Sequence, residues 1–270
     1  MAEDFTKVKQ SQQQVWPTGD YQRIVNYINL MSMSDDLCEA VRVLPHHRVL
    51  DVATGTGNTA MVAARRGFPS VTGVDFAPEL LDVARARAAT EGLNITFDAG
   101  DAEDLPYTDD SFNIVLSTCG VMFASDQERA ARELDRVCRP GGRIGLTAWT
   151  PSGAVGEFIK CIGQYAPPPA SVASPLLWGS EEHVEALFGD RVDLEIEQRS
   201  ISMYAHSPED FVESFLAHYG PAIAALNRLE PDDRQSLQRD LVQVVAGFAE
   251  PAEDSIEIAA TYLEIVGAVQ

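Results

Sequence analysis

Three aspartates follow short apolar runs at a spacing that suits recognition of a nucleoside. Asp51 lies four residues before the first glycine of Gly55-Thr56-Gly57, Asp75 ends an apolar run 18 residues after Gly57, and Asp101 follows a third run. Each carboxylate suits a different polar group: Asp51 a cationic amine, Asp75 the diol of a ribose, and Asp101 the exocyclic amine of adenine. The ligand described in this way is a nucleoside with a cationic amino-acid tail.

The glycine turn alone leaves more than one nucleotide ligand open. Read as G-x-G-x-x-A through Ala60, it also fits a dinucleotide site. Asp51 argues against that ligand, because a carboxylate beside the turn opposes an anionic pyrophosphate. The lysine of a phosphate-binding P-loop is absent. Plainer roles stay open as well: Asp51 as an acceptor for turn amides, Asp75 as a helix cap, Asp101 in a solvated loop, and Phe76 in the core rather than on adenine.

These side chains are positioned by an alternation of strands and helices. We expect strands at 48–54, 70–75, 94–99, 112–117 and 143–149, and helices at 58–66, 78–90 and 126–138. This order predicts an α/β fold, a doubly wound parallel sheet with helices on both faces.

The two ends of the chain follow other patterns. Residues 1–44 predict an N-terminal helical lid, with two helices in 20–44 that break near Ser32–Ser34. The core then spans 45–206, with a Pro-rich insert at about 150–190 that holds a short helix at 180–188. Residues 192–196 and 201–204 alternate as two further strands, and 207–270 predict a helical extension.

Bulk composition excludes several partners. The 270 residues include 41 acidic and 20 basic side chains and carry a net charge of −21, which disfavours nucleic acids and anionic membranes. The four cysteines show no metal-ligand spacing, so we expect no metal. No apolar run is long enough for a signal peptide or a membrane span, which favours a cytoplasmic protein.

Five ordered motifs between residues 45 and 150 closely resemble the class I S-adenosylmethionine-dependent methyltransferases, above all the ubiquinone/menaquinone-biosynthesis type and bacterial natural-product enzymes. They are 49–57, Val74-Asp75, 100–106, 110–113 and Arg139-Pro140-Gly141-Gly142. The resemblance implies a seven-stranded sheet of order 3-2-1-4-5-7-6 with the last strand antiparallel. It also implies S-adenosylmethionine as cofactor, and cofactor contacts from Asp51, Ala53, Gly55, Gly57, Asp75, Phe76, Asp101, Ala102 and Ser117.

The methyl acceptor leaves a weaker signal in the sequence. Residues 117–123, where such enzymes place catalytic groups, hold no His, Asp, Glu or Lys. Candidate bases therefore come from the variable ends, namely Tyr21, which we favour, and His183, His206 and His218. The expected pocket wall is apolar: Trp16, Met122, Phe123, Trp149, Phe158 and Trp178.

These features predict methylation of a hydrophobic small molecule on carbon, nitrogen or oxygen, by positioning and desolvation rather than by a strong base. The expected setting is secondary metabolism. A methyltransferase-like cyclase is the main alternative. A NAD-dependent oxidoreductase and a binding module without catalysis are more remote. We also expect a homo-oligomer that associates through the N-terminal helix.

Overall fold

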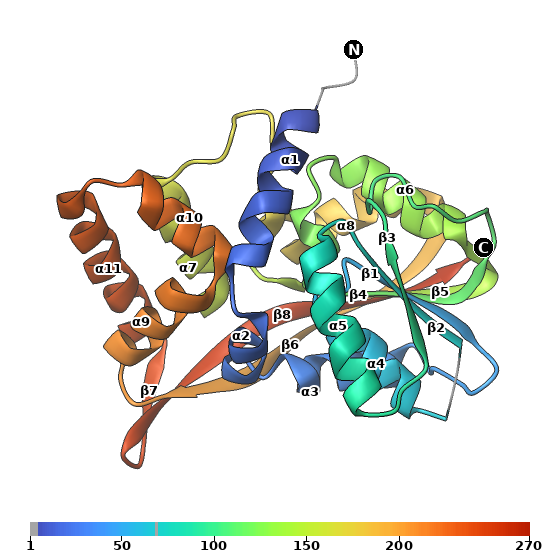
Figure 1. Ribbon diagram of the computed structural model, residues 1–270, viewed down its shortest axis with the longest axis horizontal. Helices are drawn as coiled ribbons and strands as arrows, with labels where there is room; N and C mark the ends of the chain where they lie inside the picture. Colours follow the sequence, from blue (N-terminus) through green and yellow to red (C-terminus); the bar gives the residue numbers. More distant parts are fainter. Residues whose placement is uncertain (1–4, 68–69) are drawn as a thin grey trace.

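A twisted sheet runs through the centre of the molecule and carries helices on both faces (Figure 1). The computed structural model describes residues 5–67 and 70–270. Its strands are β1 (Arg48–Val52), β2 (Ser70–Asp75), β3 (Ile95–Ala99), β4 (Phe112–Thr118), β5 (Cys138–Trp149), β6 (Val192–Ala205), β7 (Ala249–Ala252) and β8 (Ser255–Val269). The main helices are α1 (Thr6–Val15), α2 (Tyr21–Tyr27), α3 (Leu30–Ala40), α4 (Asn58–Arg65), α5 (Pro78–Thr90), α6 (Gln127–Val137), α7 (Ala154–Tyr165), α8 (Glu181–Phe188), α9 (Pro208–His218), α10 (Gly220–Arg228) and α11 (Pro231–Ala246).

The order of the sheet confirms the predicted topology. The strands lie in the order β3-β2-β1-β4-β5-β8-β6, and the short β7 pairs with β8 outside this path. Strands β1 to β5 are parallel, whereas β8 is antiparallel to both β5 and β6. A parallel sheet of this kind brings the carboxyl ends of β1, β2, β3 and β4 to one edge, where ligands bind in such folds.

Two predictions for the C-terminal part are wrong. Residues 192–205 form the single strand β6 rather than two strands, and the helical extension ends at Ala246, after which the chain forms β7 and β8. Strand β8 lies between β5 and β6, and its four consecutive residues 262–265 are all buried. A strand covered on both faces shows little alternation of polar and apolar residues, so its Ala, Leu and Glu content favoured a helix.

The N-terminal helices also differ from the prediction in their boundary. The break lies at Asn29, which adopts a left-handed conformation (φ 52°), and not at Ser32–Ser34. Ser34 lies inside α3, where its hydroxyl donates to the Leu30 carbonyl (3.0 Å) and pairs with the Thr59 hydroxyl (3.1 Å). The hydroxyl is therefore satisfied within the helix and does not cap a new one.

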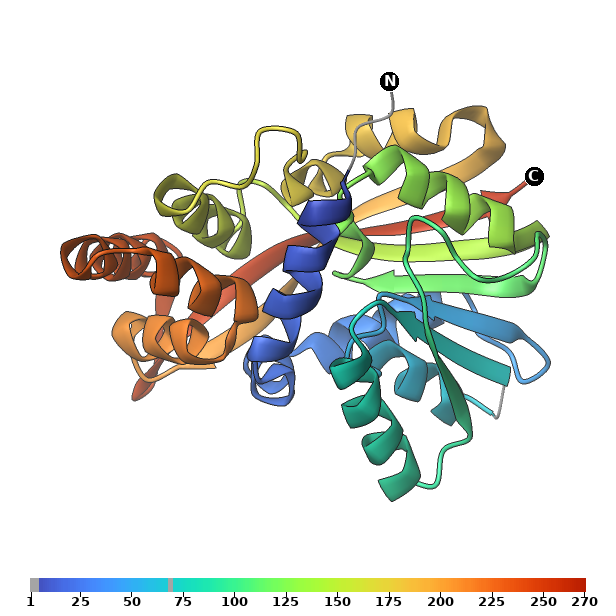
Figure 2. The same ribbon diagram turned by 45° about the horizontal axis from the view of Figure 1, so that its top comes forward.

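Strands β6 and β8 extend as a long ribbon that carries a group of helices (Figure 1, at left). We call α7, α9, α10 and α11 the helical cluster. In Figure 2, α1 lies between this cluster and the sheet with its flanking helices. Within the described residues, no helix has the length and apolar character needed to cross a membrane.

Candidate active site

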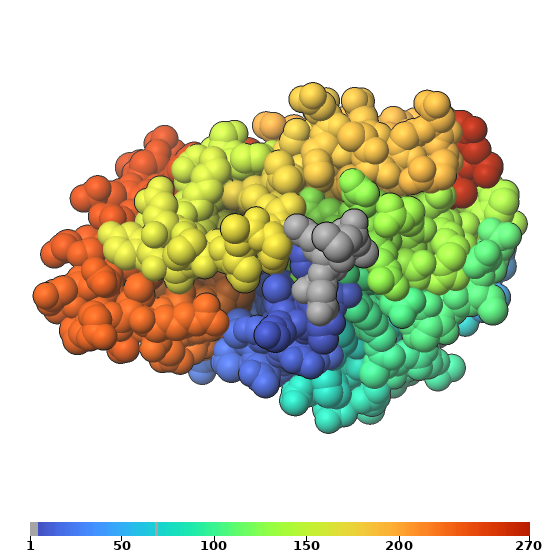
Figure 3. Space-filling view, turned by 90° about the horizontal axis from the view of Figure 1, so that it is seen from above, coloured from blue at the N-terminus to red at the C-terminus, as the bar shows by residue number. Residues whose placement is uncertain are grey.

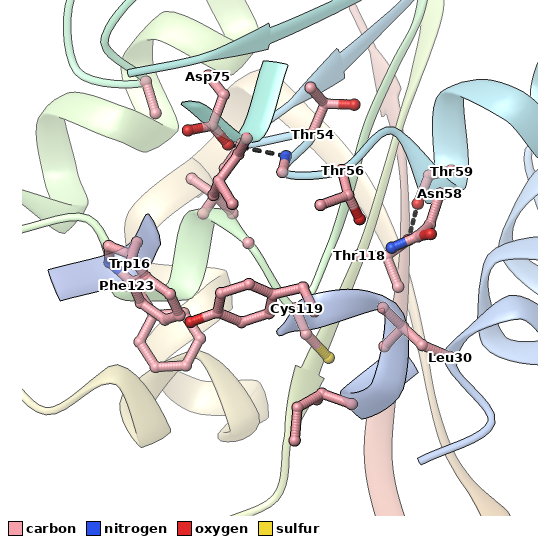
Figure 4. Close-up of a pocket in the computed structure, with 18 of the residues that line it drawn as sticks. Trp16, Leu30, Thr54, Thr56, Asn58, Thr59, Asp75, Thr118, Cys119 and Phe123 are labelled. Atoms are coloured by element: carbon pink, nitrogen blue, oxygen red, sulfur yellow. Dashed lines mark hydrogen bonds between the residues drawn. The ribbon is translucent and has the colours of Figure 1, made fainter. Parts of the chain in front are cut away.

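A pocket opens where the carboxyl ends of β1 to β4 meet α1, α2 and the helical cluster (Figure 4). One half is polar and is made by the strand ends and their loops. The other half is apolar and is made by the N-terminal segment, the β4–α6 loop and the helical cluster. The lining includes most of the residues that the sequence had indicated: Trp16, Tyr21, Asp51, Ala53, Gly55, Asp75, Phe76, Asp101, Ala102, Phe123, Trp149 and Phe158.

The glycine turn after β1 is folded around the Asp51 carboxylate. Oδ2 of Asp51 accepts hydrogen bonds from the Thr54 hydroxyl (2.5 Å) and the Ala60 amide (2.9 Å), whereas Oδ1 accepts none from the described residues. The side chain is buried, and burial raises the pKa of the carboxyl to about 7, although the two hydrogen bonds oppose the rise. The carboxylate thus both stabilises the turn and lacks a cationic partner.

Asp75 joins the end of β2 to the glycine turn and to α5. Its Oδ2 accepts from the Gly55 amide (2.8 Å), drawn as a dashed line in Figure 4, and its Oδ1 accepts from the Ala77 amide (2.9 Å). Burial raises the pKa of this carboxyl, and the bound amides limit the increase. Asp75 is therefore held rigidly at the pocket wall before any ligand arrives.

The loop after β3 is paired with a cation from the N-terminal helix. Asp101 accepts from the Glu103 amide at Oδ1 (2.9 Å) and from Lys9 Nζ at Oδ2 (2.7 Å). The same ammonium lies 2.5 Å from the Glu103 carboxylate, whose other oxygen accepts the amides of Ser125 and Asp126. Among the described residues that line the pocket, Lys9 is the only basic one, and no sequence motif indicates it.

The apolar half is walled by aromatic side chains in mutual contact. The Trp16 ring centroid lies 4.8 Å from that of Phe123, 5.9 Å from Tyr21 and 6.1 Å from Tyr219. In Figure 4, Trp16 and Phe123 lie together on the opposite side of the pocket from Asn58 and Thr59. Every charged side chain of the described lining belongs to α1, to the carboxyl end of β1 or β2, or to the loop after β3, so the aromatic half holds none.

Four predicted site residues lie outside the pocket lining and have structural roles. Gly57 has φ 84° at the start of α4, and an added Cβ would meet Ala84 and Phe97. The Ser117 hydroxyl donates to the Val52 carbonyl and accepts the Val121 amide, which ties β4 to β1. Met122 and Trp178 are fully buried in the core, so the prediction that they form the pocket wall is wrong.

None of the candidate bases lies in the pocket in a form that accepts a proton. His183 pairs with Gln127, and His206 and His218 also lie outside the lining. Tyr21 does line it, but burial and the neighbouring Tyr219 raise the pKa of its phenol. The Gly220 amide lies near the Tyr21 oxygen without hydrogen-bond geometry, and the hydroxyl has no partner among the described residues. Tyr21 therefore stays protonated.

Several lining residues left no signal that identified them in advance. Cys119 follows β4 in a left-handed conformation (φ 49°), and burial raises the pKa of its thiol to about 12. Phe215 and Tyr219 line the pocket from α9 and the residue after it. Their four-residue spacing indicates one helix face, but nothing local in the sequence shows that this face meets the ends of β1 and β4.

Comparisons with known proteins agree with this geometry. Residues 49–142 match a family model described as a methyltransferase domain. An uncharacterised protein of Mycobacterium tuberculosis is 36% identical over 245 residues, which are 87% of this chain and 86% of that protein. A demethylmenaquinone methyltransferase of Deinococcus radiodurans is 41% identical over 134 residues, 48% of this chain and 56% of that enzyme. The chain belongs to the S-adenosylmethionine-dependent methyltransferases.

Two solved structures share the methyltransferase fold. The YcgJ protein of Bacillus subtilis has a TM-score of 0.62 and 22% identity, with 88% of this chain and 99% of that chain covered. The [4+2]-cyclase SpnF has a TM-score of 0.57 and 22% identity, with 88% and 81% covered. At this identity the likeness is one of fold.

The polar half of the methyltransferase pocket fits the group that the family uses. Three carboxylates lie along one continuous lining. They are the buried Asp51, which has no cationic partner, Asp75, which is held at a strand end, and Asp101 in a loop. Cationic, diol and amine groups are the partners that such acceptors require.

Proposed function

We propose that this chain transfers a methyl group from S-adenosylmethionine to a hydrophobic small molecule, by positioning and desolvation rather than by a strong general base. The observation that carries the proposal is the pocket itself. Its polar half presents three carboxylates from the ends of β1, β2 and β3, and its other half is aromatic and uncharged within the described lining. A role in secondary metabolism is part of the proposal, by resemblance to natural-product methyltransferases.

The cofactor side of the proposal assigns a task to each strand end. Asp51 would hold the ammonium of the amino-acid tail, Asp75 the ribose hydroxyls, and Asp101 with the Ala102 amide the adenine edge. Ala53 and Gly55 have left-handed backbones (both φ 54°). An added Cβ at Gly55 would meet nothing within 4 Å, so the turn is open there for close approach of the ligand. Phe76 lies next to Asp75 in the lining and offers a ring for the adenine face.

The acceptor side works by alignment and exclusion of water. When bound, the cofactor supplies a methyl group activated by its sulfonium. Trp16, Phe123, Trp149 and Phe158 enclose the acceptor and exclude water. Raised pKa values keep the hydroxyl of Tyr21 and the thiol of Cys119 protonated, so neither removes a proton from the acceptor. The geometry thus favours acceptors that react without a strong base, such as amines, acidic phenols and electron-rich carbons.

Calorimetry and methyl transfer test this proposal together. We expect S-adenosylhomocysteine to bind and NADH not to bind, and label from methyl-labelled S-adenosylmethionine to enter hydrophobic amines, phenols or quinols. Asp82→Asn, at an exposed carboxylate on α5, serves as the control for variants in the pocket. Binding of NADH instead, or better methylation of histone or tRNA than of any hydrophobic compound, contradicts the proposal.

A cyclase is the second candidate, because an apolar pocket without a base suits ring closure as well as methyl transfer. The similarity in fold to the [4+2]-cyclase SpnF supports this candidate. Product analysis separates the two activities. A cyclised product that carries no label from the methyl donor favours the cyclase, and a labelled product favours the methyltransferase.

A further inference from the structure

Helix α1 covers the pocket, and hydrogen bonds and ion pairs of its polar side chains hold it there. None of its ten residues is fully buried. Seen from above in Figure 3, the N-terminal segment (blue) fills the space between the helical cluster (orange) and the sheet region (green). An isolated helix of this length is marginally stable in water, so α1 depends on the contacts that its side chains make with the rest of the chain.

Those contacts reach three segments that line the pocket. Gln13 Nε2 donates to the Phe76 carbonyl (3.0 Å), next to Asp75. Gln12 Nε2 donates to the Phe123 carbonyl (3.1 Å), at the aromatic wall. Lys9 Nζ bonds to Asp101 and Glu103, as described above. The β2–α5 loop, the β3–β4 loop and the β4–α6 loop are therefore all tied to one face of α1.

Lys9 makes the strongest of these contacts. Its ammonium is largely enclosed (23% exposed side chain) and bridges two carboxylates, of which Glu103 is 4% exposed. Hydrogen bonds to charged partners are stronger than the neutral amide contacts of Gln12 and Gln13. Loss of the ammonium leaves the Glu103 carboxylate buried without a cation, and only neutral contacts then hold α1 across the pocket.

We infer that Lys9 is a positioning residue of the cofactor site. Its ion pairs hold α1 closed over the polar half of the pocket, so that the cofactor enters and leaves only when these ion pairs open. The inference rests on the proposed function. Because α1 continues directly into the turn that carries Trp16 (16–18), the same opening also displaces part of the aromatic wall. Cofactor exchange and access to the acceptor half are thus coupled through one helix.

The test compares cofactor exchange in variants of two lysines on the same helix. Lys9→Met removes the ion pairs and keeps the length of the side chain, whereas Lys7→Met changes an exposed residue outside the lining. Stopped-flow tryptophan fluorescence measures binding and release of S-adenosylhomocysteine. We expect Lys9→Met to release it about tenfold faster and to bind it faster as well, in line with the usual strength of charged hydrogen bonds. Lys7→Met and the conservative Lys9→Arg should stay near the wild-type rates.

Salt provides a version of the test that needs no substitution. The proposed contact between Asp51 and the ammonium of the ligand is fully buried, so screening acts mainly on the more exposed ion pairs of Lys9. We expect release from the wild type to accelerate as ionic strength rises to about 0.5 M, where the screening length is about 4 Å, and release from Lys9→Met to change little.

Two negative outcomes are distinguishable. A wild type that binds S-adenosylhomocysteine, with equal release rates in Lys9→Met and Lys7→Met and no effect of salt, overturns the inference alone. A wild type that does not bind S-adenosylhomocysteine overturns the proposed function and the inference with it.

Discussion

Asp75 connects two parts of the cofactor half, since its oxygens hold the glycine turn and the start of α5. We predict that Asp75→Asn weakens binding of S-adenosylhomocysteine about ten- to a hundredfold, the usual cost of losing hydrogen bonds to a charged group. Isothermal titration calorimetry measures the change. The exposed Asp82→Asn should bind as the wild type does, and equal affinities for the two variants contradict a role for Asp75 in binding.

Asp51 predicts a pH dependence of cofactor affinity. Without ligand its pKa is about 7 because the carboxyl is buried. A cationic amine binds the ionised form and lowers this pKa, so binding releases a proton and affinity rises with pH through the range around 7. Below that range the affinity should fall toward tenfold per pH unit, since one unit corresponds to about 1.4 kcal/mol.

Calorimetry from about pH 5.5 to pH 8, in buffers of different ionisation enthalpy, measures both the affinity and the released proton. Asp51→Asn should flatten the profile. A wild-type profile that is already flat contradicts the proposed contact between Asp51 and the amine.

The carboxylates were predictable from sequence and their cation was not, for a physical reason. Asp51 and Asp75 lie at the carboxyl ends of β1 and β2, and Asp101 follows β3. Parallel strands bring their carboxyl ends together, so local pattern fixes the place of these side chains. Lys9 lies 92 residues from Asp101, in a polar helix without a characteristic motif. Its role depends on how α1 packs across the pocket, which no local pattern encodes.

Strand β8 joins β5 to β6 in the sheet. Ile265 is fully buried and pairs with Leu146 on β5 and with Ile196 on β6. We predict that Ile265→Ala lowers the free energy of unfolding by about 2–5 kcal/mol, the usual cost of a cavity in a core. Urea denaturation measures it. Ala268→Ser, at an exposed position of the same strand, should change stability by no more than about 0.5 kcal/mol. Equal free energies of unfolding for the two variants contradict the predicted contribution of Ile265 to the core.

Helix α5 and strand β8 differ in whether the local sequence pattern is sufficient to predict the element. Helix α5 begins at Pro78, which is favoured in a first turn, and its predicted bounds match the structure. Strand β8 is buried on both faces and has no such punctuation, so its pattern does not separate strand from helix. Its neighbours in the sheet, β5 and β6, decide the outcome, and they are distant in sequence.

Association with further copies of the chain stays a prediction. Lys9, Gln12 and Gln13 bind the pocket rim of their own chain, so an oligomer formed through α1 must use the other side of that helix. The net charge of −21 per chain opposes association at low ionic strength. We expect light scattering to give a multiple of the chain mass, with stronger association as salt is raised. A monomer mass at every salt concentration contradicts this prediction.

Cofactor binding should also stabilise the molecule as a unit. The pocket is built jointly by the sheet edge, α1 and the helical cluster, so a ligand that fills it favours the state in which all three are packed together. At a hundredfold excess over its dissociation constant, a ligand adds about 2.7 kcal/mol to stability, which for a chain of this size raises the melting temperature by about 5–10 °C. We therefore predict a shift of this size in differential scanning calorimetry with S-adenosylhomocysteine, a much smaller shift in Asp75→Asn, and none with NADH. A shift with NADH alone contradicts the assignment of the glycine turn to a cationic amino-acid nucleoside, because the pyrophosphate would then have to bind beside Asp51.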